Sequence, residues 1–297
     1  KGVRAPLGFY TSLIGVGRDP SDVSVPYAFS VNGDKGGATQ NFWRSVEGVT
    51  LTDHAIVWAV SQGSPIRRSV VEGSLFLSDN GGWSSGGFIA NVRIGGDLNM
   101  GTQQQWFFRN VDLSGRVRCP TGWNYVFMGV TGVDAEACQA NITGKVSTIT
   151  STPRIAEKPY LIMEDSGGVE ESWSIFVPPL LHSIPQQLLR GVRALARASA
   201  LLGKRLDLVA EVFVARPGMS ASQINAGMQS MKGLLLTPGV YVINEPILVD
   251  KDEFVVLGIG FPTLVAEREA PVLQISASAS GVRVAGLLLE AGSGSGD

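Results

Sequence analysis

Three tryptophans in the first half of the sequence lie among glycine, serine and amide residues, a composition suited to sugar binding. Trp83 is in the middle of the segment DNGGWSSGGF, Trp106 follows three consecutive glutamines, and Trp123 precedes an asparagine. An exposed indole ring stacks on the apolar C–H face of a sugar, while amides and carboxylates bind its hydroxyl groups. The alternative is that these rings are buried as packing in turns. We predict that a polysaccharide is bound by Trp83, Gln104, Trp106, Trp123 and Asn124.

Acid–base chemistry would need carboxylates, and the sequence offers two candidates. Asp79 lies close to Trp83, and Glu290 lies near the end of the sequence. Most Asp and Glu side chains are solvated surface groups, so the sequence does not identify the catalytic residues. His54 and His182 are far apart and have no cysteine nearby, so we expect no zinc site. No motif indicates another cofactor.

The two cysteines and one glycosylation sequon indicate the compartment in which the protein is found. Cys119 and Cys138 are 19 positions apart; they form either a disulfide or two buried free thiols. A disulfide closing this loop would stabilise the fold by roughly 3 kcal/mol. Asn141 begins an Asn-Ile-Thr glycosylation sequon. Together these features predict a secreted or extracellular protein that is glycosylated at Asn141.

The composition excludes several classes of protein. The 297 residues are 44% hydrophobic and 17% charged, with a formal net charge of −2. Disordered chains combine low hydrophobicity with high net charge, so this chain is expected to fold. No bulk positive charge favours nucleic acid. No apolar run approaches the roughly 20 residues that span a bilayer.

A short repeated pattern predicts the elements that position these residues. An aromatic residue or Ile, two further residues, Ser or Asn, and then Val occur in four copies, which begin at Phe42, Ile66, Phe88 and Phe107. Spacings of 24, 22 and 19 residues, with short β-rich segments between them, are typical of coils in a β-solenoid. An antiparallel sandwich is the rival interpretation. We predict an all-β parallel β-helix in which Phe88 and Phe107 lie on adjacent strands.

The same pattern predicts two columns of polar residues along the solenoid. Arg44, Arg68 and Arg109 each precede the Ser or Asn of a copy, which predicts a stack of arginines. Such a stack needs anions, either an acidic polysaccharide or the carboxylates of Glu47, Glu72 and Asp112. Asn91 and Asn110 occupy equivalent places and predict an asparagine ladder, which stabilises stacked turns.

A longer repeat indicates two solenoids in tandem. The segment IGVG at residues 14–17 resembles LGIG at residues 257–260, so we expect two solenoid segments, both incomplete. The first covers residues 1–150, a connection covers 151–232, and the second begins at 233. Within the connection, the arginine-rich stretch 186–205 has apolar residues at helical spacing. Ser220 is expected to cap a helix over 221–232 that covers the open end of the second solenoid.

Two segments carry a family resemblance. ATQNFWRSVEGVTL with the following WAVSQGSPIRRSVVEG, and TPGVYVINEPILVDKDEFVVLGIGFPTLVA, resemble secreted double β-helix proteins related to family 55 glycoside hydrolases, in the pectate-lyase-like superfamily. Relatives often carry the label adenylyl cyclase. The resemblance implies two side-by-side right-handed parallel β-helices and exo-β-1,3-glucanase-like inverting hydrolysis. It also implies a general-acid Glu further along the second helix than residue 297.

These observations leave two functions open. The first is a secreted carbohydrate-active protein, glycoside-hydrolase-like, that binds or hydrolyses an extracellular polysaccharide, with β-glucan the favoured substrate. The second is a non-catalytic structural or interaction module of a wall, a matrix or a larger assembly. The expected partners are the polysaccharide and either the rest of the protein's own precursor or other subunits. Since fold alone does not fix function, the choice depends on the site.

Overall fold

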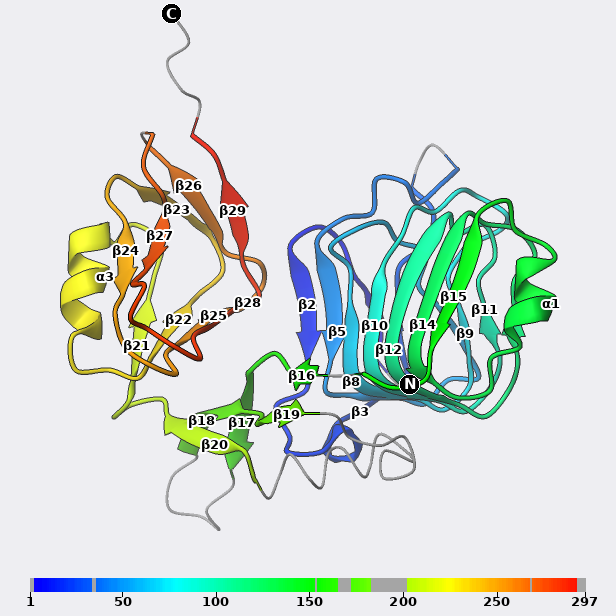
Figure 1. Ribbon diagram of the computed structural model, residues 1–297, viewed down its shortest axis with the longest axis horizontal. Coiled ribbons are helices and arrows are strands. Elements are labelled where there is room, and N and C mark those ends of the chain that lie inside the picture. The colour runs from blue at the N-terminus through cyan, green and yellow to red at the C-terminus, as the bar shows by residue number, and fades with distance from the viewer. Residues whose placement is uncertain are drawn as a thin grey trace, which may run out of the picture. The chain divides into compact units, whose positions relative to one another are not determined.

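The computed structural model describes residues 3–33, 36–152, 154–164, 172–182, 202–267 and 269–292. The chain forms two compact units. The first comprises Lys1–Ala156 with Leu180–Leu201, and the second comprises Glu157–Pro179 with Leu202–Asp297. Each unit contains a parallel β-solenoid, drawn from blue to green in the first unit and from yellow to red in the second (Figure 1). The helix expected in the arginine-rich stretch falls almost entirely outside the described residues.

The first unit is built on one long parallel sheet, and the predicted parallel solenoid is confirmed. Neighbouring strands of the sheet belong to successive coils and follow the order β2 (Thr11–Ile14), β5 (Arg44–Glu47), β8 (Ile66–Val71), β10 (Phe88–Ile94), β12 (Gln105–Leu113), β14 (Asn124–Val130) and β15 (Lys145–Ile149). Phe88 pairs with Phe107 in register, as the repeat predicts. A second parallel sheet closes the coils and contains β7 (Ala55–Val57), β9 (Ser74–Phe76), β11 (Leu98–Asn99) and β13 (Val117–Arg118).

The N-terminal coils carry shorter elements. Strand β1 (Arg4–Pro6) pairs with β4 (Tyr27–Phe29), and β3 (Ser24–Val25) pairs with β6 (Thr50–Leu51). A one-turn 3-10 helix, η1 (Pro20–Asp22), begins at an Asp19 cap.

The core of this unit is a column of apolar side chains in register along the axis. The pairings of successive strands align Val46, Ile66, Ile89, Phe108 and Phe127, and all five are almost completely buried. The rings of Phe108 and Phe127 stack with centroids 4.9 Å apart. No coil can bury these residues alone, so stacking of the coils supplies the hydrophobic stabilisation.

A left-handed residue recurs at one place in four successive coils. The register passes over Arg68, Asn91, Asn110 and Gly129, and all four have positive φ, from +47° to +63°. Asparagine tolerates this conformation better than other non-glycine residues. The Asn110 amide also donates to the Asn91 side-chain oxygen at 3.2 Å. The predicted asparagine ladder is therefore confirmed.

The predicted arginine stack is wrong. Val46 pairs with Ile66, so these coils are offset by 20 residues and not by the 24 that the sequence pattern suggests. Arg44 therefore lies beside Thr11, whereas Arg109 lies between Ala90 and Met128. The Arg44 guanidinium is buried and donates to the Leu7 carbonyl at 2.7 Å. Burial lowers its pKa.

The predicted disulfide joins Cys119 to Cys138, with the Cα atoms 5.1 Å apart. Cys138 is on helix α1 (Ala135–Gln139), which is capped by Asp134 and packs against β15. Both cysteines are buried in the core cluster of the first unit. The alternative of two free thiols is excluded, and the crosslink ties α1 to the β13 coil.

Replacing both cysteines by alanine should lower the free energy of unfolding by roughly 3 kcal/mol, because the crosslink restricts the unfolded chain. Urea denaturation of Cys119→Ala/Cys138→Ala and of the wild type, each with and without reductant, measures this difference. Reduced wild type should match the double variant. Equal stability of the oxidised wild type and the variant would contradict the expectation.

Two small antiparallel sheets come from the predicted connection. In the first unit, β16 (Arg154–Ala156) pairs with β19 (Leu180–His182). In the second unit, β17 (Tyr160–Glu164), β18 (Ser172–Val177) and β20 (Lys204–Asp207) form a three-stranded sheet.

The second solenoid has three parallel sheets. Their orders are β21 (Val212–Ala215), β22 (Gly233–Leu236), β25 (Val255–Gly258), β28 (Arg283–Ala285); β23 (Val240–Ile243), β26 (Thr263–Ala266), β29 (Leu288–Glu290); and β24 (Ile247–Val249), β27 (Leu273–Ile275).

Helix α3 (Ala221–Met228) covers the first coil of this solenoid, as the sequence predicts, but it ends four residues before the predicted end at Lys232. Ser220 and Gln223 form a capping box at its start. The Asn225 amide donates to the Pro246 carbonyl at 3.0 Å and accepts from the Leu248 N–H at 2.9 Å. Strand β24 is the first of its sheet, so no preceding strand pairs with its backbone. The Asn225 side chain takes that place by hydrogen-bonding the backbone on both sides.

Candidate carbohydrate-binding site

Four of the five predicted sugar-binding residues lie at the turns that lead into the main sheet of the first unit, namely Trp83, Gln104, Trp123 and Asn124. We call this set of stacked turns the corner, which comprises residues 8–10, 40–43, 61–65, 83–87, 103–105 and 122–124. Backbone hydrogen bonds join successive turns: Gln104 N–H donates to the Ser84 carbonyl at 3.1 Å, and Trp123 N–H donates to the Gln104 carbonyl at 2.7 Å. Coils repeat at about 4.8 Å, so Trp83 and Trp123 are on coils about 10 Å apart.

The buried side chain of Gln103 links three successive coils next to the corner. Gln103 is completely buried. Its amide donates to the carbonyls of Val60 at 3.0 Å and Leu77 at 2.7 Å, and its side-chain oxygen accepts from the Gly86 N–H at 2.8 Å. The Gln103 carbonyl lies 2.6 Å from the Tyr125 hydroxyl. Both N–H groups and the oxygen of the Gln103 side chain are thus hydrogen-bonded within the protein. Gln103 therefore positions the corner and does not bind ligand.

Trp83 is exposed and its backbone is fixed, as a sugar-stacking residue requires. Its side chain is 57% exposed, while its carbonyl accepts from the Ala38 N–H at 2.6 Å. Gly82 has no space for a side chain, since an added Cβ would lie 2.3 Å from the Gly36 carbonyl. The ring is therefore presented to solvent from an ordered turn.

Trp123, Gln104 and Asn124 are placed as predicted, at the solvent side of the same corner. The Trp123 ring is 48% exposed. Asn124 is exposed and its side-chain oxygen accepts from the Lys145 N–H at 3.1 Å, which leaves its NH₂ group facing solvent. Gln104 is half-buried, and its side chain forms no hydrogen bond within the described part of the chain.

The structure corrects the prediction for Trp106. Its ring is only 3% exposed and stacks on Phe108 with centroids 5.8 Å apart. Strand alternation explains the difference, because Trp106 pairs with the inward-facing Tyr125. The ring packs over Gly87, where an added Cβ would lie 2.3 Å from it. Trp106 therefore belongs to the core and not to a sugar groove.

The two carboxylate candidates lie in different units. The Asp79 carboxylate accepts from the Asn32 N–H at 3.1 Å, and its carbonyl accepts from the Asn32 amide at 2.7 Å. These bonds fix the turn before Trp83, which is a structural role. Glu290 is exposed on β29 of the second unit. Glycoside hydrolysis uses a pair of facing carboxylates, and the contacts of Asp79 and Glu290 assign neither residue to such a pair.

An aromatic cluster that we did not predict as a site occupies the N-terminal end of the corner. Tyr10 and Trp43 stack with centroids 5.3 Å apart and planes at 17°, and Phe9 lies 6.2 Å from Trp43. Phe9 and Tyr10 are 50% and 49% exposed. The Arg44 guanidinium lies 5.1 Å from the centroid of the Phe9 ring. Phe9 and Tyr10 therefore present solvent-facing rings, and the half-buried Trp43 packs against both.

The backbone conformation of this cluster points to a functional role. Tyr10 and Trp43 occupy the same place in successive turns, and the strand register puts Gly63 and Gly86 there in the next two. All four have positive φ, +57° and +51° for the aromatic residues and +69° and +93° for the glycines. Left-handed backbone costs an L-residue roughly 1–2 kcal/mol. Tyr10 and Trp43 thus carry bulky side chains at positions where glycine would be less strained. This strain indicates that the rings have a function beyond packing.

The signal for this cluster was present in the sequence. Four aromatic residues, Phe9, Tyr10, Phe42 and Trp43, lie in two short segments, and Gln40 and Gln62 lie beside them. Both glutamines are exposed, and the Gln62 amide reaches the Ser85 hydroxyl at 3.3 Å. Phe42 also begins a copy of the structural repeat, so the repeat alone does not distinguish a binding role for these rings from a packing role.

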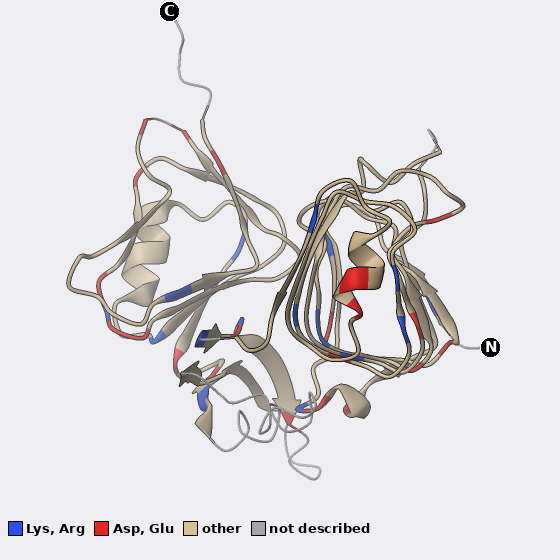
Figure 2. Cartoon of the chain, turned by 45° about the vertical axis from the view of Figure 1, so that its right-hand side comes forward, with Lys and Arg blue, Asp and Glu red and all other residues tan. Residues whose placement is uncertain are grey.

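The corner is electrically neutral. None of its residues is charged, whereas Figure 2 marks Lys, Arg, Asp and Glu elsewhere on both units. Amides and hydroxyls both donate and accept hydrogen bonds. Aromatic faces flanked by neutral amides match an uncharged polysaccharide better than an acidic one.

Three carboxylates have a pKa below the ordinary value, each because of hydrogen bonds. The Arg116 N–H and then the Arg118 guanidinium lower the pKa of Asp97. The Lys232 ammonium lowers the pKa of Glu211, and the Ser280 N–H lowers that of Asp252. A lowered folded-state pKa stabilises the fold above the ordinary value and loses that contribution as pH falls through the folded value.

Acid should therefore weaken the fold through these groups. We expect Asp97→Asn to lower the melting temperature at about pH 7, and we expect this difference to shrink as the pH falls through the lowered folded-state pKa of Asp97. Thermal unfolding of both proteins across this range measures the difference. An effect of Asp97→Asn that grows as pH falls would contradict the sign of the shift.

Comparisons with known proteins converge on one group. Residues 212–296 match the family model of the LAM55 pectate lyase-like domain. The chain is 35% identical over 300 residues to an exo-beta-1,3-glucanase of Streptomyces sp. (strain SirexAA-E / ActE), an alignment that covers 98% of this chain and 46% of that enzyme. The solved structure of sacteLam55A from Streptomyces sp. SirexAA-E matches with a TM-score of 0.82 and 34% identity, over 98% of this chain and 52% of that one.

A second solved structure matches the chain equally well. It is a variant of sacteLam55A in complex with glucose, and it matches with a TM-score of 0.82, 33% identity and the same coverage of both chains. The chain thus spans about half the length of the relatives it matches.

Proposed function

We propose that this chain, a parallel β-helix protein related to the family 55 glycoside hydrolases, acts on β-1,3-glucan as a glycoside hydrolase of the exo-β-1,3-glucanase type. The observation that carries the proposal is the 35% identity to an exo-beta-1,3-glucanase across 98% of the chain. The neutral, aromatic corner supports it, because β-1,3-glucan is an uncharged polysaccharide. In the part of the chain that the structure describes, no helix is long and apolar enough to cross a membrane.

In this proposal the corner binds the glucan. Tyr10 and Trp43 stack on the sugar at one end, and Trp123 stacks at the other. The amides of Gln40, Gln62, Gln104 and Asn124 take the hydroxyl groups between and beside these rings. Trp83 presents a further ring from the same row of turns.

The test is product release from linear β-1,3-gluco-oligosaccharides. An exo-acting hydrolase should release small sugars from one chain end, and inverting chemistry should give the α-anomer first, as read by proton NMR. A β-1,4-glucan and an acidic polysaccharide serve as controls and should be neither bound nor cleaved. Absence of both binding and release with β-1,3-glucan would overturn the proposal.

One observation favours a second candidate, a glucan-binding module without hydrolytic activity. The corner combines aromatic rings with neutral amides, and none of its residues is an Asp or Glu that could act as an acid or base. Binding of β-1,3-glucan with no released sugar would select this function.

We also propose an extracellular location. The buried disulfide supports it, because disulfides persist in oxidising compartments. Asn141 follows helix α1 and is exposed, so its sequon is open to glycosylation. Mass spectrometry of the natural protein before and after glycosidase treatment tests the modification, and an unmodified Asn141 in material from a glycosylating host would refute it.

A further inference from the structure

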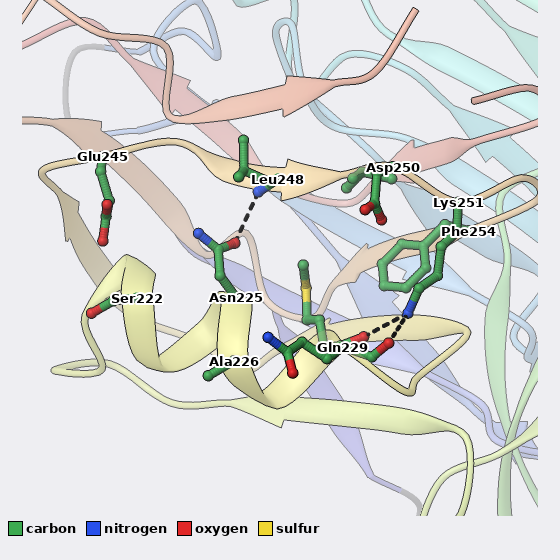
Figure 3. A pocket seen from close by; sticks show the side chains of 11 residues that line it. Ser222, Asn225, Ala226, Gln229, Glu245, Leu248, Asp250, Lys251 and Phe254 are labelled. Carbon is green, nitrogen blue, oxygen red and sulfur yellow. Dashed lines mark hydrogen bonds between the residues drawn. The ribbon is translucent and has the colours of Figure 1, made fainter. Parts of the chain in front are cut away.

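A pocket on the second unit has no role in the function proposed above. It has a volume of about 440 Å³ and lies between α3 and β24. Figure 3 shows Glu245 and Ser222 at one side of it, Asp250, Lys251 and Gln229 at the other, and Leu248 and Asn225 between them. A pocket of this size accommodates a small ligand.

The charged and polar side chains of the pocket differ in whether they are already hydrogen-bonded within the protein. The Lys251 ammonium hydrogen-bonds the carbonyls of Met228 at 3.0 Å and Met231 at 3.1 Å, and also that of Gln229. It is therefore committed to the C-terminal end of α3. The side chains of Glu245, Asp250 and Gln229 hydrogen-bond nothing among the described residues. These three groups are available to a ligand.

The middle of the pocket is apolar. Leu248 is 50% exposed, and the buried side chains of Met228 and Phe254 also line the cavity. The Asn225 amide is occupied by its two bonds to the backbone at β24. The pocket thus presents hydrogen-bonding groups at two sides and an aliphatic surface between them.

This arrangement fits a sugar ring better than a metal ion. The two carboxylates lie on opposite sides in Figure 3, and the described residues include no group of three or more His, Cys, Asp or Glu side chains that could hold a metal. Ionised carboxylates only accept hydrogen bonds, so the ligand must supply donors. A pyranose has hydroxyl donors around its edge and C–H groups on its faces.

We propose that the α3–β24 pocket is a second saccharide site, which takes a neutral gluco-oligosaccharide with its hydroxyls on Glu245, Asp250 and Gln229 and its C–H face on Leu248. The choice of a glucose-based ligand rests on the proposed function, whereas the site itself rests on the geometry of the second unit alone.

The test follows the Leu248 methyl groups by NMR while β-1,3-glucotriose is added to the protein. These signals should shift in the wild type and in Trp43→Gly, which removes a ring of the corner. In Glu245→Gln/Asp250→Asn, the ligand concentration that gives half of the maximal shift should be at least tenfold higher than in the wild type. Glu290→Gln is the matched control, an exposed carboxylate of the same unit outside the pocket, and should behave as the wild type.

The outcomes separate the two proposals. Shifts of the corner indole signals without any Leu248 shift would overturn the pocket and leave the proposed function intact. A Leu248 shift that is unchanged in the double variant would also overturn the pocket, as would a shift produced only by a glucosamine trimer, which would indicate a site for amines. Absence of corner shifts would count against the proposed function instead.

Discussion

Trp43→Gly should weaken binding of β-1,3-glucan by roughly 5- to 30-fold while leaving the fold intact. Covering an indole face with sugar removes about 50–80 Å² of apolar surface from water, worth about 1–2 kcal/mol at about 25 cal/mol per Å². Glycine is the matching replacement because Trp43 has φ +51°, so the substitution relieves about 1 kcal/mol of backbone strain. That gain offsets part of the ring packing lost on Tyr10, Phe9 and Phe42, where each aromatic pair is worth about 0.5–1.5 kcal/mol. The variant should therefore stay folded with a lower free energy of unfolding.

Calorimetric titration with a β-1,3-gluco-oligosaccharide and urea denaturation together measure the two effects. The matched control is Phe261→Gly in the second unit, since Phe261 is also an aromatic residue with positive φ, +56°, outside the corner. It should leave the affinity unchanged. Full affinity in Trp43→Gly would refute the binding role, and a loss of affinity that occurs because the variant is unfolded at the titration temperature would show that the ring is structural.

Gln103→Ala should lower the free energy of unfolding by about 3–5 kcal/mol. The substitution removes a completely buried side chain and leaves the Val60 and Leu77 carbonyls and the Gly86 N–H without their partner. Each buried polar group left unsatisfied costs about 1–3 kcal/mol, and the cavity adds to this cost.

The neighbouring glutamine provides the control for this experiment. Gln104→Ala removes a half-buried side chain that hydrogen-bonds nothing in the described residues, so it should change stability by less than about 0.5 kcal/mol. In the proposed function it should instead weaken glucan binding. Equal losses of stability in the two variants, measured by urea denaturation, would contradict the assignment of Gln103 as the residue that joins the turns.

The fold was predictable because stacked coils leave a periodic mark on the sequence. The copies at Phe88 and Phe107 are 19 residues apart and pair directly. The earlier copies mislead because turns of different length change the offset, so Ile66 pairs with Ile89 and not with Phe88. The arginine stack failed for this reason. Hydrogen bonds across coils fix such offsets, and no local pattern encodes them.

The site was predictable in part. Glycine-rich surroundings correctly indicated that Trp83 and Trp123 are exposed. Trp106 looked similar in sequence, but it follows Gln105 on the same strand, so alternation turns its ring inward. The Tyr10–Trp43 stack joins residues 33 positions apart across one irregular coil, and its left-handed backbone is visible only in the structure.

The most direct test of this account is a crystal structure with a linear β-1,3-gluco-oligosaccharide bound. The account predicts a sugar ring stacked on Tyr10 and Trp43, with its hydroxyls on the neighbouring glutamine amides. An oligosaccharide bound elsewhere on the first unit, with the corner rings in contact only with solvent, would contradict it.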